Sequence, residues 1–219
     1  MRDIQRKTPS LSGPMQGLLE LAQRLYQQQS QDKHKLYSIH APEVACISKG
    51  KAHKRYEFGC KVGVSASSEG GWVLGILAFH DSPYDGHTLE KSLAQVARIS
   101  PVDVEHVFVD GSYQGHTYQG STQVHISKRG KRLKASLKRW FKRRAAIEPT
   151  IAHLKHDKRL NRNRLKGHTG DAINAVLSGA GYNLMKLGKA LKALFLSWLA
   201  FSTLVVLKRR YLSSFASAV

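Results

Sequence analysis

The chain has 219 residues, and its 42% hydrophobic and 8% aromatic content is typical of a globular protein and excludes a disordered basic tail. Its 35 lysines and arginines outnumber 15 acidic residues, so the expected partner is a polyanion, with nucleic acid ahead of an anionic membrane. The N-terminus lacks the apolar core of a secretory signal. Cys46 and Cys60, the only cysteines, lack close pair spacing, so we expect a reduced cytoplasmic protein with neither a disulfide framework nor a cysteine zinc site.

Residues 15–34 carry apolar side chains at helical spacing and predict a helix. Residues 37–54, which mix proline, glycine, serine and lysine, predict an irregular basic connector. Residues 56–64 alternate between apolar and polar side chains, which predicts a strand with one buried face. A glycine-containing turn at 67–71 and an apolar strand at 72–79 would complete a hairpin.

The middle of the chain predicts one helix and two short strands. A helix is expected near residues 88–98, capped by Thr88 or Asp85, and we interpret Asp85 as a helix cap instead of a metal ligand. The β-branched run 104–110 predicts a strand that ends on a carboxylate, followed by a glycine. Residues 123–128 predict another brief strand.

Helices are expected from about residue 131 and again from about 170 to 195. Strands followed by helices in this order predict an α/β domain with a mixed sheet. We divide the chain into an N-terminal helix and connector at 1–54, a main domain at 55–190 and an apolar and basic tail at 191–219.

The tail contains an uncharged, mostly apolar run at residues 193–207. This run is shorter than the roughly 18 residues that a membrane helix needs. We therefore expect an apolar helix that packs on protein and no membrane partner, with a membrane-associated tail as the alternative.

The most basic part of the chain is residues 128–166, where 16 lysines and arginines surround two acids, Glu148 and Asp157. Lysine-rich faces are often merely solvated, but this excess, with aromatic residues interleaved, favours binding to a nucleic acid backbone. A solitary carboxylate in such a surface would repel phosphate unless a divalent cation lay between them. Glu148 therefore points to metal-dependent chemistry on nucleic acid.

On a continuous helix, Phe141, Arg144, Glu148 and Lys155 would share one stripe. Pro149 should kink that helix or start a new one in its first turn. The ordinary alternative is a solvated surface pair between Arg144 and Glu148, worth a few tenths of a kcal/mol at most.

Asp110 stands where a strand gives way to a glycine, at the kind of strand end that often presents functional groups. Its ordinary alternative is an aspartate that starts a turn by bonding nearby backbone.

The pattern F-x2-R-x3-E-x6-K from Phe141 to Lys155 resembles the Y-x2-R-x3-E-x6-K motif of DDE transposases of bacterial insertion sequences. Phe141 takes the tyrosine position, and the other three positions match at Arg144, Glu148 and Lys155. The run V-F-V-D-G-S-Y-Q-G-H resembles the strand with that family's second aspartate, which maps to Asp110. Further similar segments lie at 49–59, 82–89, 160–168 and 170–177, so that the resemblance covers about residues 35–190.

The resemblance implies a ribonuclease-H-like fold, with a mixed sheet and flanking helices. Asp110 and Glu148 would be catalytic and, with a third carboxylate, would bind two Mg²⁺ ions. One ion would activate water or a 3′-hydroxyl for attack on a DNA phosphodiester, and the other would stabilise the leaving oxygen. Phe141, Arg144 and Lys155 would contact the DNA, although Phe141 lacks the tyrosine hydroxyl.

The partners implied by the resemblance are double-stranded DNA at transposon ends and target, with a homodimer as one option, in the bacterial cytoplasm at the nucleoid. The family also needs a first aspartate on its opening strand, and we identify none in this sequence. We therefore expect the C-terminal part of a longer transposase. Two alternatives are an inactive DNA-binding remnant lacking that aspartate and a basic RNA-binding or ribosome-associated protein.

Other residue groups and motifs give weaker indications of function. His153 and His156 lie three residues apart, but no convergent zinc ligands can be placed, so we favour solvated or phosphate-facing histidines. Neither a G-x-x-x-x-G-K-[ST] phosphate loop nor a G-x-S-x-G nucleophile motif occurs.

Overall fold

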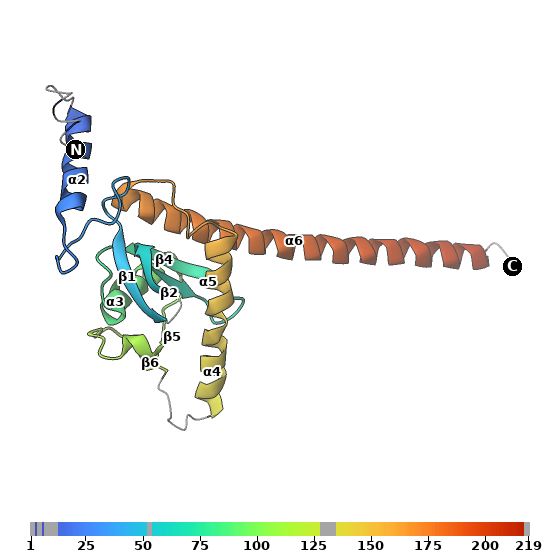
Figure 1. Cartoon of the computed structure of the whole chain (residues 1–219). Helices are drawn as coiled ribbons and strands as arrows, with labels where there is room; N and C mark the ends of the chain where they lie inside the picture. The colour runs from blue at the N-terminus through green and yellow to red at the C-terminus, as the bar shows by residue number, and fades with distance from the viewer. Residues whose placement is uncertain (1–2, 4–5, 7–12, 52–53, 128–134, 217–219) are drawn as a thin grey trace. The chain divides into compact units, whose positions relative to one another are not determined.

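The computed structural model describes residues 3, 6, 13–51, 54–127 and 135–216 (Figure 1). The chain divides into two compact units, Met1–Gly179 and Ala180–Val219. The first unit holds all the described strands and the helices α2 to α5, and both acidic candidate residues belong to it. The predicted boundaries at 54 and 190 stay predictions.

Helix α2, Gly13–Gln27, ends seven residues earlier than the sequence predicts. In the glutamine-rich segment after the helix, a glutamine side chain forms hydrogen bonds with the backbone of a later residue, and the helix does not continue. The Gln28 side chain donates to the Leu36 carbonyl at 2.8 Å and accepts from the Leu36 backbone N–H at 2.9 Å. Leu36 is 2% exposed, so these two bonds satisfy backbone groups beside a buried side chain.

Strand β1, Ala45–Lys51, lies where the sequence predicted an irregular connector. It pairs antiparallel with β2, Lys54–Gly59, in a register that sets Cys46 opposite Phe58. The prediction was wrong because the low strand propensity of this segment is overridden by its pairing with β2. The expected buried face is also wrong at its start, since Tyr56 and Phe58 are 57% and 62% exposed.

The predicted strand at 56–64 is in fact two strands that belong to different ladders. Gly59 ends β2 with φ +139°, a conformation that favours glycine, and β3 begins at Lys61 and runs to Ala66. β3 pairs antiparallel with β4, Val73–Phe79, which confirms the predicted hairpin and its turn. In that turn the backbone N–H of Ser67 donates to the Trp72 carbonyl at 2.8 Å.

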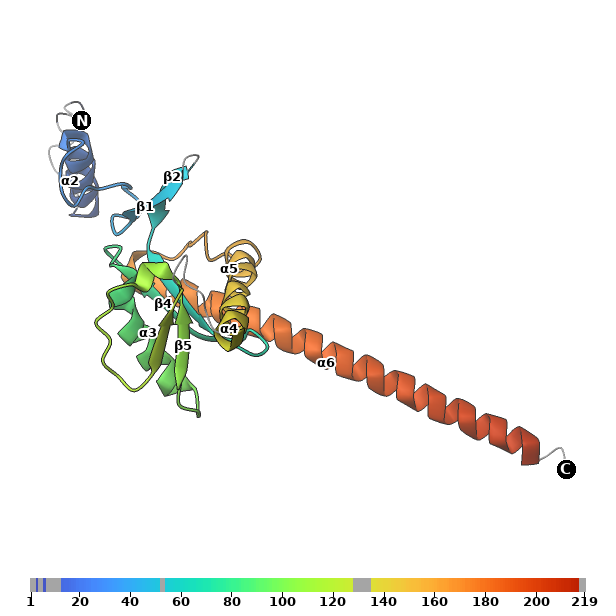
Figure 2. The ribbon, with the colours of Figure 1, turned by 90° about the horizontal axis from the view of Figure 1, so that it is seen from below.

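Helix α3, Asp85–Ile99, contacts the β3–β4 hairpin and β5, which runs from His106 to Val109 (Figures 1 and 2). Leu89 and Leu93 of the helix form a core cluster with Val109. The helix begins three residues before the predicted start, with no side-chain cap at its N-terminus. Asp85 is therefore not the expected cap, and it pairs instead with Lys61 at 3.0 Å.

Strand β5 pairs in parallel with β6, Gln123–Ile126, and the connection between them holds the short 3-10 helix η1, Gly111–Tyr113. The described strands thus form three two-stranded ladders, two antiparallel and one parallel. The mixed helix and strand content is compatible with the predicted α/β class. The sequence predicted one mixed sheet, whereas the described strands form three separate ladders. The ribonuclease-H-like fold stays a prediction.

Three helices complete the chain. α4, Ala135–Ala145, and α5, Ile147–His156, are separated by one residue, and α6 runs from Gly167 to Ala216 (Figure 1). Residues 167–206 of α6 are long and apolar enough to cross a membrane by length and composition, and described side chains there are largely exposed. The expected packing of the tail on protein stays a prediction.

Candidate active site

Asp110 directly follows β5 and caps η1. Its Oδ1 accepts hydrogen bonds from the Ser112 backbone N–H, at 2.9 Å, and from the Ser112 hydroxyl. The turn-starting role that the sequence allows is therefore confirmed. The same aspartate is exposed, and both described bonds use Oδ1, so Oδ2 has no hydrogen-bond partner among the described residues.

Glu148 is the second residue of α5, and Pro149 is the third. The proline therefore lies in the first turn of a new helix, as predicted, where its missing N–H costs nothing. Glu148 is exposed, and no ion pair involves it among the described residues. The ordinary Arg144–Glu148 surface pair is thus not formed, and the Glu148 carboxylate is open to solvent.

An aromatic contact joins β5, the strand just before Asp110, to α4, the helix just before the one that carries Glu148. The Phe108 ring of β5 stacks on Trp140 of α4, with ring centroids 5.9 Å apart, and meets Phe141 edge to face at 5.4 Å. Phe108 and Asp110 are two residues apart, so they point to the same side of an extended backbone. The contact therefore places the last residues of β5, just before Asp110, beside α4, whose chain continues through Ala146 into α5.

Buried residues fix α5 to the rest of the first unit. Leu154 is fully buried and Thr150 is 4% exposed. Lys155, next to Leu154, is half-buried, and it shares α5 with Glu148 at an offset of seven residues. Seven residues are close to two helical turns, or about 10 Å of rise, so both side chains belong to one face.

Two of the three arginines of α4 lie against an aromatic ring. Arg139 and Arg143 lie 5.8 and 5.1 Å from the centroid of the Trp140 ring, and Arg143 also pairs with Glu69 at 3.5 Å. Arg144 is half-buried and makes no described ion pair. Much of the predicted basic segment before α4 lies outside the described residues.

Of the two histidines at 153 and 156, His153 bonds to an aspartate at the end of α5. His153 Nδ1 lies 2.6 Å from Asp157 Oδ2, one helical turn away. This hydrogen bond lowers the pKa of the exposed Asp157 carboxyl below its usual range. The one group of three potential ligands found among the described residues lies elsewhere.

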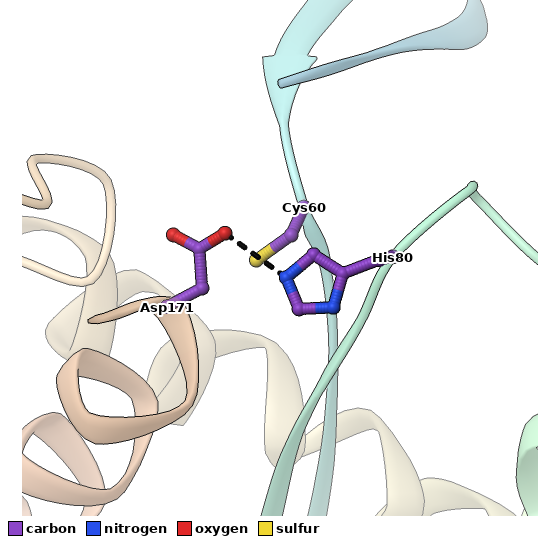
Figure 3. Close-up of side chains that lie close together, drawn as sticks. All are labelled: Cys60, His80 and Asp171. Carbon is purple, nitrogen blue, oxygen red and sulfur yellow. Dashed lines mark hydrogen bonds and ion pairs between the residues drawn. The ribbon is translucent and has the colours of Figure 1, made fainter. Parts of the chain in front are cut away.

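Cys60, His80 and Asp171 form that group, and sequence reasoning missed it (Figure 3). One ligand atom from each residue lies within 4.8 Å of the others, and Nε2 of His80 is 3.1 Å from Oδ2 of Asp171. Burial, followed by the charge of Asp171, raises the pKa of the Cys60 thiol to about 12. The three residues lie far apart in the chain and belong to no local motif, so no spacing could have revealed them.

Comparison with known proteins gives one match. Residues 109–188 match the family model described as a transposase DDE domain, a segment that starts at the end of β5 and contains Asp110, Glu148 and Lys155. No curated protein and no solved structure matches the chain.

Proposed function

We propose that this chain is a DDE-class transposase, because its residues 109–188 match the transposase DDE domain, and that it acts in insertion-sequence transposition by metal-dependent cleavage and strand transfer of DNA. Asp110 and Glu148 are the proposed catalytic carboxylates. The observation that carries the proposal is the contact of Phe108 with Trp140 and Phe141. It holds the strand that delivers Asp110 against the helix that leads to Glu148.

The two carboxylates suit the ion that this family uses. Magnesium prefers hard oxygen donors and keeps several waters, so it needs few protein ligands and an open site. Asp110 offers an oxygen that no described residue occupies, and Glu148 is exposed and unpaired among the described residues. A divalent ion held there would activate the attacking hydroxyl and stabilise the leaving oxygen.

The surrounding cations support binding of the DNA backbone. Arg144 would contact phosphate through its planar guanidinium group, and Lys155 as a point charge on the same helix face as Glu148. The half-buried position of both side chains limits their conformations before DNA binds. Phe141 packs on Phe108, so its proposed contact with DNA would use only the outward part of its ring.

The test is nicking of supercoiled plasmid DNA carrying candidate transposon ends, in Mg²⁺ or Mn²⁺. We expect Asp110→Asn and Glu148→Gln each to reduce nicking by on the order of 100-fold. Asparagine keeps a side-chain acceptor for Ser112, so this variant removes charge with little effect on the turn. Glu90→Gln on α3 is the matched control, because Glu90 is an exposed acid outside the proposed site.

Binding of Mn²⁺, followed by electron paramagnetic resonance, separates metal binding from chemistry. Both site variants should weaken Mn²⁺ binding, whereas Glu90→Gln should not. Nicking that persists in both site variants would exclude these two residues as the catalytic pair. DNA binding without metal-dependent nicking would instead indicate the inactive DNA-binding form.

A further inference from the structure

We propose that Cys60, His80 and Asp171 bind a zinc ion at a site separate from the two proposed catalytic carboxylates. The three side chains point toward one another in Figure 3, from the β2–β3 junction, the residue that follows β4 and the fifth residue of α6. All three are partly buried, with 18% and 16% of the His80 and Asp171 side chains exposed. They therefore form a partly buried cluster within the first unit, unlike a group of exposed surface acids.

The donor set selects the metal. A thiolate, an imidazole and a carboxylate together match zinc, a borderline-soft ion, and do not match magnesium or calcium, which take oxygen ligands. Zinc bond lengths of about 2.0 to 2.3 Å place tetrahedral ligand atoms roughly 3.3 to 3.8 Å apart. The separation of 3.1 Å between His80 Nε2 and Asp171 Oδ2 is just below this range, and the 4.8 Å limit for the whole group lies about 1 Å above it, so the ligand atoms would shift by about 1 Å or less to bind the ion.

Neighbouring residues already orient two of the ligands. Asn163 donates through Nδ2 to Oδ1 of Asp171 at 2.8 Å, which leaves Oδ2 directed at the cluster. The His80 ring stacks on the His168 ring with centroids 3.8 Å apart, which holds its plane. Hydrogen bonds and packing of this kind around a ligand set are what metal sites use to fix their first ligands.

Zinc binding has a simple proton balance here. The Cys60 S–H bond breaks, a sulfur–zinc bond forms, and the thiol proton leaves to solvent. Three protein ligands leave the fourth position of the ion to a water molecule.

Uptake of zinc by the untagged full-length chain tests the proposal. After chelator treatment, the chain should take up one zinc per molecule, measured by elemental analysis after removal of free metal. Cys60→Ser should reduce this uptake by at least about tenfold in affinity. Cys46→Ser is the matched control, because Cys46 is the only other cysteine and lies outside the cluster.

Cobalt substitution gives a second measurement that does not depend on the folding of Cys60→Ser. In Cys46→Ser the sole thiol is Cys60, so a thiolate-to-cobalt charge-transfer band in that variant can come only from this site. Absence of the band, or zinc uptake equal in Cys60→Ser and the unmodified chain, overturns the proposal. Asp171→Asn should weaken uptake as well, and Asp110→Asn should leave it unchanged, which separates this site from the proposed catalytic one.

Discussion

The rings of Phe108 and Phe141 meet edge to face at 88°, with centroids 5.4 Å apart, and this contact links β5 to α4. Such aromatic pairs are worth about 0.5 to 1.5 kcal/mol beyond the apolar area that they bury. Phe141→Leu should therefore lower the free energy of unfolding by about 1 kcal/mol and reduce metal-dependent nicking, because the strand end and α5 lose a common support. Urea denaturation measures the first effect and plasmid nicking the second.

Phe141→Tyr is the control for this change. It keeps the ring and restores the hydroxyl that the family motif has at this position. Stability should stay within about 0.5 kcal/mol of the unmodified chain. A Phe141→Leu protein with unchanged stability and unchanged nicking would contradict the role of the contact.

DNA affinity should fall steeply with salt, since phosphate contacts release condensed cations. Each phosphate contact contributes about 0.9 to the slope of log K against log salt. Arg144→Ala and Lys155→Ala should each reduce that slope by about one contact, measured by fluorescence anisotropy on a duplex at several salt concentrations. Lys91→Ala on α3, an exposed lysine outside the proposed surface, should leave the slope unchanged.

Leu154 is fully buried on the helix that carries Glu148 and Lys155. Leu154→Ala should lower the free energy of unfolding by about 2 to 5 kcal/mol, because it removes buried methyl groups and leaves a cavity. Leu165→Ala is a control with the same chemistry at a side chain that is 46% exposed, and it should cost less than about 1 kcal/mol. Thermal and urea unfolding compare the two, and equal costs would show that α5 is not anchored at Leu154.

The His125 ring of β6 stacks on the Phe108 ring, and its Nε2 atom lies 3.3 Å from Nδ1 of His106. Burial, followed by the charge of His106, lowers the pKa of His125 below its usual value. Between these two pKa values the unfolded chain therefore binds more protons at His125 than the folded chain does. The contribution of neutral His125 to the free energy of unfolding is complete above about pH 6.5 and is lost as the pH falls through the lower pKa of the folded state.

Urea unfolding between pH 8 and pH 5 measures this effect. The loss of stability toward acid should be smaller in His125→Gln than in the unmodified chain. His40→Gln, at an exposed histidine, should lose as much stability as the unmodified chain does. If His125→Gln lost as much stability toward acid as the unmodified chain, His125 would not be a cause of that loss.

Local patterns predicted the elements around the candidate active site. The β-branched run before Asp110 and the glycine after it carry a strong strand-end signal, and the strand and its turn are both present. Pro149 was expected to kink a helix or open a new one, and it lies in the first turn of α5. These features depend on neighbours in sequence, which is why one sequence was enough to find them.

Features that depend on distant pairing could not be predicted in this way. β1 has a composition typical of a loop and becomes a strand only by pairing with β2. The same holds for Cys60, His80 and Asp171, where pairwise spacing excluded a zinc site but the fold brings a lone cysteine to two distant ligands. Whether Asp110 and Glu148 share a metal stays a prediction, because it depends on the tertiary placement of two exposed side chains.

Cys60 is the single residue between the last residue of β2 and the first residue of β3. Gly59, just before it, has the backbone freedom of a hinge. Any swing of the β1–β2 ladder about this joint would carry the sulfur atom toward or away from His80 and Asp171. The orientation of the β1–β2 ladder is therefore coupled to the distance between the Cys60 sulfur and the other two side chains. A ligand that fixes the sulfur would also fix the orientation of that ladder.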